Sequence, residues 1–204
     1  MNKAVIDLSN YRSRYGFKHR FVRALWSIVW TLFARPLPRS MGGGWKRFLL
    51  RLFGTKIPKT SNVYSSAKIF WPANLIMGEY SCIDSNVNFY NVDKVYIGDN
   101  TTISQGAFIC PGSHDISDPM NPMICKPMYI EDQVWIASEA FVGGSGIRIG
   151  QGAVVGARAA VFKDVEPWTV VGGNPAKVLK MRKIINRGGV NPTSQIVSLQ
   201  HLAA

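Results

Sequence analysis

The chain has 204 residues, of which 47% are hydrophobic, so its composition excludes an intrinsically disordered protein and fits one main domain with an appendage. The formal net charge is +12, which predicts an anionic partner: a phosphate-bearing cofactor, an acidic glycan, a nucleic acid or an anionic membrane. The three cysteines have no C-x-x-C spacing, which argues against a disulfide framework or a zinc site and favours a reducing, cytoplasmic environment.

Residues 1–56 are predicted to form a basic, aromatic-rich helical arm. Between Tyr11 and Lys59 the sequence contains twelve Lys or Arg and no acidic residue. Its apolar run between Arg23 and Arg35 has eleven residues, too few to cross a bilayer as a helix, which takes about 20. Two interpretations remain open: the arm packs on its own domain or a neighbouring subunit, or residues 17–53 lie on the inner face of an anionic membrane.

Residues 57–183 are predicted to form a repeating all-β domain. Apolar residues recur every six positions in five groups of three, and the residue four positions later is small or β-branched in fourteen of fifteen cases, Asp93 being the exception. Such a hexad is one short strand and a turn, and three of them close a triangular coil around an apolar interior. The apolar positions are Ile57, Val63, Ile69, Met77, Ile83, Phe89, Ile97, Ile103, Ile109, Ile130, Ile136, Val142, Ile149, Val155 and Val161.

The extra residues in this repeat all follow the third hexad of a coil, so every insertion is expected to leave from the same corner. The longest is a loop at residues 115–129, directly after His114. Loops of this length inside a regular repeat are usually functional. The period therefore predicts that His114 lies at the corner and points away from the coil.

Three stretches carry a resemblance to a known family: IGDNTTISQGAFICPGSHD (97–115), KPMYIEDQVWIASEAFVG (126–143) and IGQGAVVGARAAVFKDVEPWTVVGGNPAKVLK (149–180). They resemble the hexapeptide-repeat acyltransferases, in particular the branch of maltose, galactoside, nodulation-factor and colanic acid acetyltransferases. The resemblance implies a left-handed parallel β-helix of about five coils with an extruded loop, preceded by the helical arm. It also implies acetyl-CoA as acetyl donor, a homotrimer with the donor between neighbouring subunits, and a short helix after GGNPAK (172–177), followed by a C-terminal tail at 184–204.

The resemblance also assigns roles to single residues. His114 is expected to be the general base that takes a proton from the acceptor hydroxyl as it attacks the thioester. The group that orients its imidazole stays open between Asp115 and Asp118, and Asp115 is also a candidate to contact the acceptor. Asp84 stands where the family has a sugar-binding asparagine. Contacts with the acetyl donor are expected from Trp135, Ser138, Gly143, Ala157, Lys163, Lys177 and Lys180.

The expected function is acetylation of a sugar hydroxyl in exopolysaccharide or capsule assembly, with a sugar or lipid-linked glycan as acceptor, in the cytoplasm or at the inner face of the membrane. Acetyl transfer to an amine or small molecule, such as an amino sugar, serine or an antibiotic, remains the alternative. A non-catalytic scaffold is a further possibility. No metal site is expected, because a zinc enzyme of the carbonic anhydrase type needs three histidines and the repeats contain only His114. No nucleic-acid partner is expected, because no recognised binding motif accompanies the charge.

Overall fold

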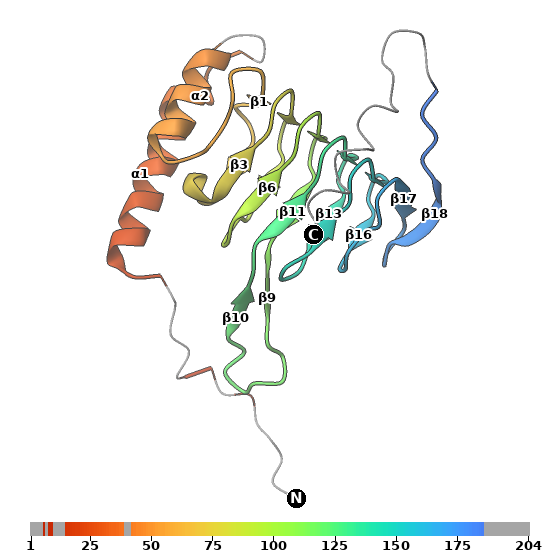
Figure 1. The fold of residues 1–204 in the computed structure, drawn as a ribbon. Coiled ribbons are helices and arrows are strands. Elements are labelled where there is room, and N and C mark those ends of the chain that lie inside the picture. Colours follow the sequence, from red (N-terminus) through yellow and green to blue (C-terminus); the bar gives the residue numbers. More distant parts are fainter. Residues whose placement is uncertain (1–5, 7, 10–14, 39–41, 186–204) are drawn as a thin grey trace, which may run out of the picture.

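The computed structural model describes residues 6, 8, 9, 15–38 and 42–185. Two helices, α1 (Phe17–Phe33) and α2 (Gly43–Leu52), lie beside one end of a long stack of short strands (Figure 1). Most of the predicted tail, residues 186–204, lies outside the described residues, as do parts of the predicted arm.

The strands form three sheets that run along the stack, and the chain passes through one strand of each sheet per coil. All pairs between coils are parallel, so the molecule is a parallel β-helix, as the period of six predicts. Sheet 1 contains β1 (Asn62–Val63), β4 (Cys82–Ile83), β7 (Thr102–Ile103), β12 (Trp135–Ile136), β15 (Val154–Val155), β17 (Thr169–Gly172) and β18 (Lys177–Met181). Sheet 2 contains β2 (Lys68–Ile69), β5 (Asn88–Phe89), β8 (Phe108–Cys110), β13 (Phe141–Gly143) and β16 (Ala160–Val161). Sheet 3 contains β3 (Leu75–Met77), β6 (Val95–Ile97), β11 (Met128–Ile130) and β14 (Arg148–Ile149).

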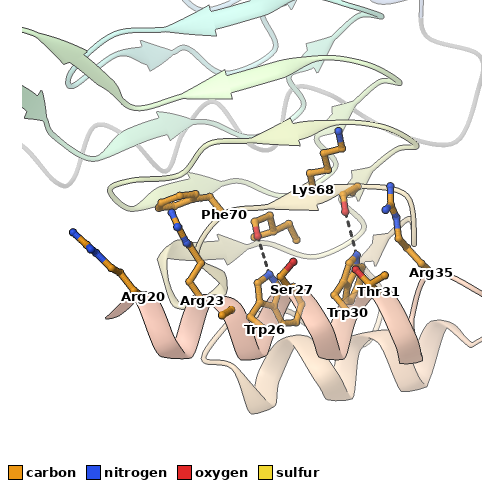
Figure 2. A pocket seen from close by; sticks show the side chains of 12 residues that line it. Arg20, Arg23, Trp26, Ser27, Trp30, Thr31, Arg35, Lys68 and Phe70 are labelled. Carbon is orange, nitrogen blue, oxygen red and sulfur yellow. Dashed lines mark hydrogen bonds between the residues drawn. The ribbon is translucent and has the colours of Figure 1, made fainter. Parts of the chain in front are cut away.

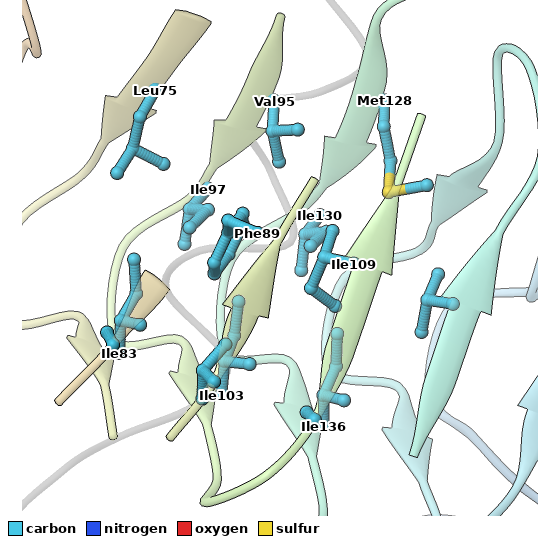
Figure 3. Close-up of a cluster of buried hydrophobic side chains, with 14 of the residues drawn as sticks. Leu75, Ile83, Phe89, Val95, Ile97, Ile103, Ile109, Met128, Ile130 and Ile136 are labelled. Carbon is cyan, nitrogen blue, oxygen red and sulfur yellow. The ribbon is translucent and has the colours of Figure 1, made fainter. Parts of the chain in front are cut away.

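The interior is a column of stacked apolar side chains, and all fifteen predicted inward residues are buried. In sheet 1, Ile83, Ile103 and Ile136 pair in register, so each side chain lies directly over the next (Figure 3). Removing an aliphatic side chain of this size from water contributes about 1.5–3 kcal/mol before conformational entropy is counted. The sequence prediction of the core is therefore confirmed.

The hexad pattern also predicts that the residue four positions after each apolar residue points inward, and this holds only in part. The prediction was wrong at the third hexad of the first four coils, where Ala73, Asp93, Ser113 and Gly146 are not buried. The inserted residues carry the chain outward there, and it returns to the interior two residues before the next apolar position. Large side chains consequently enter the core at the start of each strand of sheet 3 or just before it: Leu75, Val95, Met128 and Ile147.

All four insertions leave between sheets 2 and 3, a corner that we call the insertion corner. The first contains a 3₁₀ turn, η1 (Pro72–Asn74). The longest forms an antiparallel hairpin of β9 (Gly112–His114) and β10 (Met123–Cys125), which projects away from the coils (Figure 1). The hairpin thus begins before His114, and β11 already starts at Met128.

The two helices pack on the first coil. Trp26 and Trp30 are buried beneath α1, and their indole Nε1–H groups donate to the carbonyls of Ile69 (2.8 Å) and Ala67 (3.1 Å). Both carbonyls lie on or beside β2, the outermost strand of sheet 2, which has no partner strand on this side within the described residues. Helix α2 contacts β1, the outermost strand of sheet 1. In the part of the chain that the structure describes, no helix combines the length and apolar character needed to cross a membrane.

The C-terminal end of the stack differs from the expectation. The helix predicted after GGNPAK is not formed, because residues 177–181 are the strand β18, antiparallel to β17. The last parallel strand, β17, offers unpaired backbone groups, and the returning chain satisfies them with a ladder that a helix would not provide.

Candidate active site

The hairpin fixes the position of His114 through its backbone. His114 ends β9 opposite Met123 of β10, and its side chain is exposed. The tip between the two strands is closed by a hydrogen bond from the Asp115 N–H to the Pro122 carbonyl (3.0 Å). Asn121 adopts a left-handed conformation (φ 48°), which Asn tolerates better than most residues. This turn directs the Asn121 carbonyl at the histidine.

The imidazole of His114 is held in one tautomer. Its Nδ1 lies 2.7 Å from the backbone carbonyl oxygen of Asn121. A carbonyl oxygen can only accept, so the neutral ring carries its proton on Nδ1 and leaves the Nε2 lone pair free to accept one. This is the arrangement that a general base needs.

The carboxylates of Asp115 and Asp118 accept hydrogen bonds from other residues of the loop. Asp115 Oδ1 accepts the Ser117 hydroxyl (2.5 Å) and the Ser117 N–H (3.0 Å), and these bonds lower the pKa of Asp115. Asp118 Oδ1 accepts the Met120 N–H (2.8 Å). Both residues shape the turn, while the group that hydrogen-bonds the His114 ring is the Asn121 carbonyl. The contact of Asp115 with an acceptor stays a prediction.

Two residues that are predicted to contact the acetyl donor, Gly143 and Lys163, lie at the insertion corner with the hairpin. Gly143 ends β13 and pairs with Cys110, the residue at which the chain leaves for the hairpin. Lys163 is exposed and follows β16 at the same corner, one coil further along. Burial raises the pKa of the Cys110 thiol, which disfavours the reactive thiolate form of this neighbour.

The other predicted residues lie on sheet 1 and on the corner between sheets 1 and 2, which we call the first corner. Trp135 stands on the outer face of sheet 1, 47% exposed, and its Nε1–H donates to Ser104 Oγ (2.9 Å). Ser138 and Ala157 lie one above the other at the first corner, because Ile136 and Val155 pair in register. Asp84 follows β4 at this corner, and its carboxylate accepts the Ser85 N–H (2.6 Å).

Lys177 and Lys180 lie on β18, whose residues are all exposed. A recess of about 290 Å³ beside Trp135 is lined by Arg182 just after that strand. The Arg182 guanidinium donates to the carbonyls of Gln133 (2.8 Å) and Gly152 (2.9 Å), which ties the end of β18 to the turns that precede β12 and β15.

The predicted site residues therefore occupy two separate edges of one chain. His114, Gly143 and Lys163 belong to the insertion corner, whereas Trp135, Ser138 and Ala157 belong to sheet 1 and the first corner. Sheet 2 lies between these edges, and the hairpin extends away from it (Figure 1). A single chain does not bring the two sets together.

Sequence reasoning missed Asn121, Ser104 and Arg182. The Asn121-Pro122 dipeptide is a turn signal, yet the direction of a backbone carbonyl within a turn cannot be read from it. Among the residues that the structure describes, no group of three or more His, Cys, Asp or Glu side chains could hold a metal ion.

Comparisons with known proteins connect this architecture with acetyl transfer. No family model matches the chain. The chain is 37% identical over 179 residues to WcaF of Escherichia coli strain K12, provisionally assigned as a colanic acid biosynthesis acetyltransferase, and the match covers 86% of the chain and 97% of WcaF.

Two solved structures share the fold. A hexapeptide-repeat acetyltransferase of Vibrio cholerae in complex with acetyl-CoA is 25% identical, with a TM-score of 0.74 over 85% of this chain and 94% of the other. A maltose O-acetyltransferase of Clostridium difficile 630 is 26% identical, with a TM-score of 0.73 over 83% and 90%. Together with the β-helix and its hairpin histidine, these relationships show that the chain belongs to the hexapeptide-repeat acetyltransferases.

Proposed function

We propose that the chain transfers an acetyl group from acetyl-CoA to a hydroxyl of a sugar acceptor in exopolysaccharide or capsule synthesis. The observation that carries the proposal is the tautomer of His114, fixed by the Asn121 carbonyl with Nε2 free to accept a proton. The assigned role of WcaF, the acetyl-CoA complex of the Vibrio cholerae relative and the maltose acceptor of the Clostridium relative support the donor and the acceptor class.

In the proposed reaction, Nε2 of His114 removes the proton of the acceptor hydroxyl as its oxygen attacks the thioester carbonyl carbon. The Asn121 carbonyl keeps its hydrogen bond from Nδ1–H and stabilises the imidazolium that forms. When the C–S bond breaks, the imidazolium returns its proton to the leaving sulfur, so the products are the acetyl ester and free coenzyme A. Base assistance of this kind accelerates reactions by about 10²–10⁴-fold.

The site is further proposed to form between two copies in a homotrimer. The separation of the two predicted edges supports this, because a neighbouring copy can place its sheet 1 edge beside the hairpin of the first. Trp135, Ser138 and Ala157 would line the donor channel, and Lys163, Lys177 and Lys180 would face the phosphates of the donor. Asp84 and Asp115 are proposed acceptor contacts.

Mixed assemblies test the shared site. His114→Ala and Trp135→Ala chains are each expected to be nearly inactive alone. In trimers assembled at random from equal amounts of both, about a quarter of the sites combine an intact His114 with an intact Trp135 from the neighbour, so activity should return to about that level. No recovery in mixed trimers would place both residues in one chain and contradict the shared site.

The proposed location is the cytoplasmic face of a membrane. The side of α1 that faces away from the β-helix exposes Phe17, Phe21, Leu25, Ile28 and Leu32. No acidic residue occurs between positions 8 and 78, so an anionic leaflet would meet uncompensated positive charge around this apolar stripe. Sedimentation with vesicles that contain anionic lipid tests the contact, and a Phe21→Ser/Leu25→Ser variant that sediments like the wild type would contradict it.

The acetyl transfer itself is tested by incubating the protein with acetyl-CoA and candidate sugars and following release of free thiol. We expect thiol release with neutral sugars and a fall of about 10²–10⁴-fold in kcat for His114→Ala. Undiminished release by this variant would remove the proposed base. Activity on amino sugars but not on neutral sugars would favour the amine acceptor instead.

A further inference from the structure

A groove between α1 and the first coil lies apart from the proposed acetyl-transfer site. It encloses about 510 Å³, a volume within the usual range for ligand sites. Helix α1 forms one wall, and β2 with the following residue Phe70 forms the other (Figure 2). The floor consists of the buried rings of Trp26 and Trp30, whose indole N–H groups are already bonded to backbone carbonyls.

The groove is lined by four cations and no carboxylate. Arg20, Arg23 and Arg35 come from α1 or the residues just after it, and Lys68 comes from β2. None of the four forms an ion pair with a described residue, since the ion pairs there join Arg148 to Glu131 and Arg158 to Glu139. The positive potential in the groove is consequently not compensated from within the described structure.

Two of these cations come from opposite walls of the groove, Arg23 from α1 and Lys68 from β2. The Arg23 guanidinium carbon lies 4.8 Å from the centre of the Phe70 ring, which holds that side chain against the strand. Lys68 and Phe70 are two residues apart, so their side chains leave the same face of the chain about 7 Å from each other. The hydroxyls of Ser27 and Thr31 face the same space as additional donors (Figure 2).

We propose that this groove binds a phosphate or diphosphate group. Arginine and lysine supply charge-assisted hydrogen bonds, and phosphate oxygens accept several at once. A phosphate matches the four cations and two hydroxyls among the lining residues, and the lining contains no carboxylate that would repel it.

The groove also suggests what carries the phosphate. Phe70 follows β2, Tyr90 follows β5 and Cys110 ends β8, and because these strands pair in register the three residues form one column at the insertion corner. Cys110 is where the chain leaves for the hairpin of His114, two coils or about 10 Å from Phe70. The exposed apolar stripe of α1 flanks the groove on its other side. We therefore assign the ligand to the diphosphate of a lipid-linked glycan acceptor. This assignment rests on the proposed function.

Binding of inorganic pyrophosphate to the full chain, measured by calorimetry, tests the groove. Arg23→Gln/Lys68→Gln should weaken binding by roughly a hundredfold, about tenfold for each charge-assisted hydrogen bond that is removed. The control Lys56→Gln/Lys59→Gln removes the same charge from exposed positions outside the groove and should change binding less than about threefold. Absence of binding by the wild type, or equal weakening in both variants, would overturn the proposal.

Binding to vesicles distinguishes two sources of the phosphate, a polyprenyl diphosphate and a phospholipid headgroup. Neutral vesicles doped with a polyprenyl diphosphate should retain the wild type and the control but not Arg23→Gln/Lys68→Gln. If phosphatidylglycerol vesicles of matched charge show the same dependence on Arg23 and Lys68, the ligand is a phospholipid headgroup and the assignment to the acceptor is overturned.

Acetylation assays separate this proposal from the proposed function. Arg23→Gln/Lys68→Gln should raise the KM for a diphosphate-linked sugar by roughly tenfold or more and leave kcat/KM for the free sugar unchanged. His114→Ala should lose activity on both acceptors. If the groove variant loses activity with neither acceptor, the acceptor assignment is removed while the proposed base stays intact.

Discussion

The β-helix and the helical arm use their apolar residues in opposite ways. In the β-helix, the large aliphatic side chains of every coil point inward and are buried. In α1, Trp26 and Trp30 are buried, but a second apolar stripe on the opposite side of the helix is exposed, with Phe21 60% exposed. Stacking of the coils thus explains the apolar residues of the β-helix, whereas the arm carries exposed apolar and basic surface that its own packing does not require. This exposed surface indicates that the arm binds a partner.

The largest expected difference between the two regions comes from removing a phenylalanine. Phe89 is fully buried in the second coil, so Phe89→Ala should destabilise the protein by about 3–5 kcal/mol through lost transfer energy and the cavity left behind. Phe21→Ala in the exposed stripe should change stability by no more than about 0.5 kcal/mol. Denaturant unfolding followed by circular dichroism measures both. Similar losses in the two variants would show that the stripe is packed.

Replacing a glycine by alanine is expected to change stability in opposite directions in the two regions. A Cβ at Gly98 would lie 2.5 Å from the backbone nitrogen of Asp132 in the next coil, so Gly98→Ala must push two coils apart and should cost about 1–3 kcal/mol. At Gly44 in α2, the added Cβ would meet no described atom within 4 Å beyond its chain neighbours and its own helix backbone, and Gly44→Ala should stabilise the helix by up to about 1 kcal/mol. Melting temperatures of the two variants should move in opposite directions, and a shared direction would refute the contrast.

The contact between the two regions can be weakened at a single hydrogen bond. Trp26→Phe keeps most of the buried ring but leaves the Ile69 carbonyl without its indole donor, so we expect a loss of about 1–2 kcal/mol. Trp45 donates to the Phe33 carbonyl at an exposed site, where water can replace the indole, and Trp45→Phe should cost about 0.5 kcal/mol or less. Hydrogen exchange of α1 would show whether the first loss is local to the arm.

The smallest expected effect is a pH dependence of the arm. His19 is stacked on Tyr15 and Trp71, and its pKa is lowered by burial and by the neighbouring Arg23. Because the pKa is lowered, the folded state binds a proton at His19 less readily than the unfolded chain does. The free energy of unfolding is therefore highest at pH values above the ordinary histidine pKa of about 6.5, and it declines as the pH falls below that value. The melting temperature should fall slightly between about pH 7 and pH 5.5, and His19→Gln should reduce that slope. An unchanged slope would exclude His19 as its source.

The regular part of the molecule was predictable because a period of six leaves one side chain per strand facing inward. That logic located the fifteen apolar core residues of the hexads and the corner from which the hairpin leaves, but not the large residues that enter the core around the start of the sheet 3 strands. It failed at Ser113 and Gly146, where inserted residues interrupt the period. The short helix that the family resemblance implied after GGNPAK was also wrong, because β18 pairs there with the edge of β17.

The candidate site was predictable only in part, and for a similar reason. His114 was located by its motif and its corner, but its partner is a backbone carbonyl whose direction depends on the left-handed turn at Asn121. The placement of the predicted residues on two edges depends on which corner each hexad reaches, which becomes visible only when the coils are stacked. The basic groove lies between segments about 45 positions apart in the sequence, so no local pattern indicates it.

The hydrogen bonds from Trp26 and Trp30 to the first coil have a consequence for the length of the particle. A β-helix that ends in a bare strand exposes a template on which another molecule could add its own strands end to end, and growth of this kind produces fibres. Here the indoles of Trp26 and Trp30 occupy carbonyls that an incoming strand would need. Helix α1 thereby acts as a terminator, and the enzyme remains a particle of defined size instead of a seed for polymerisation.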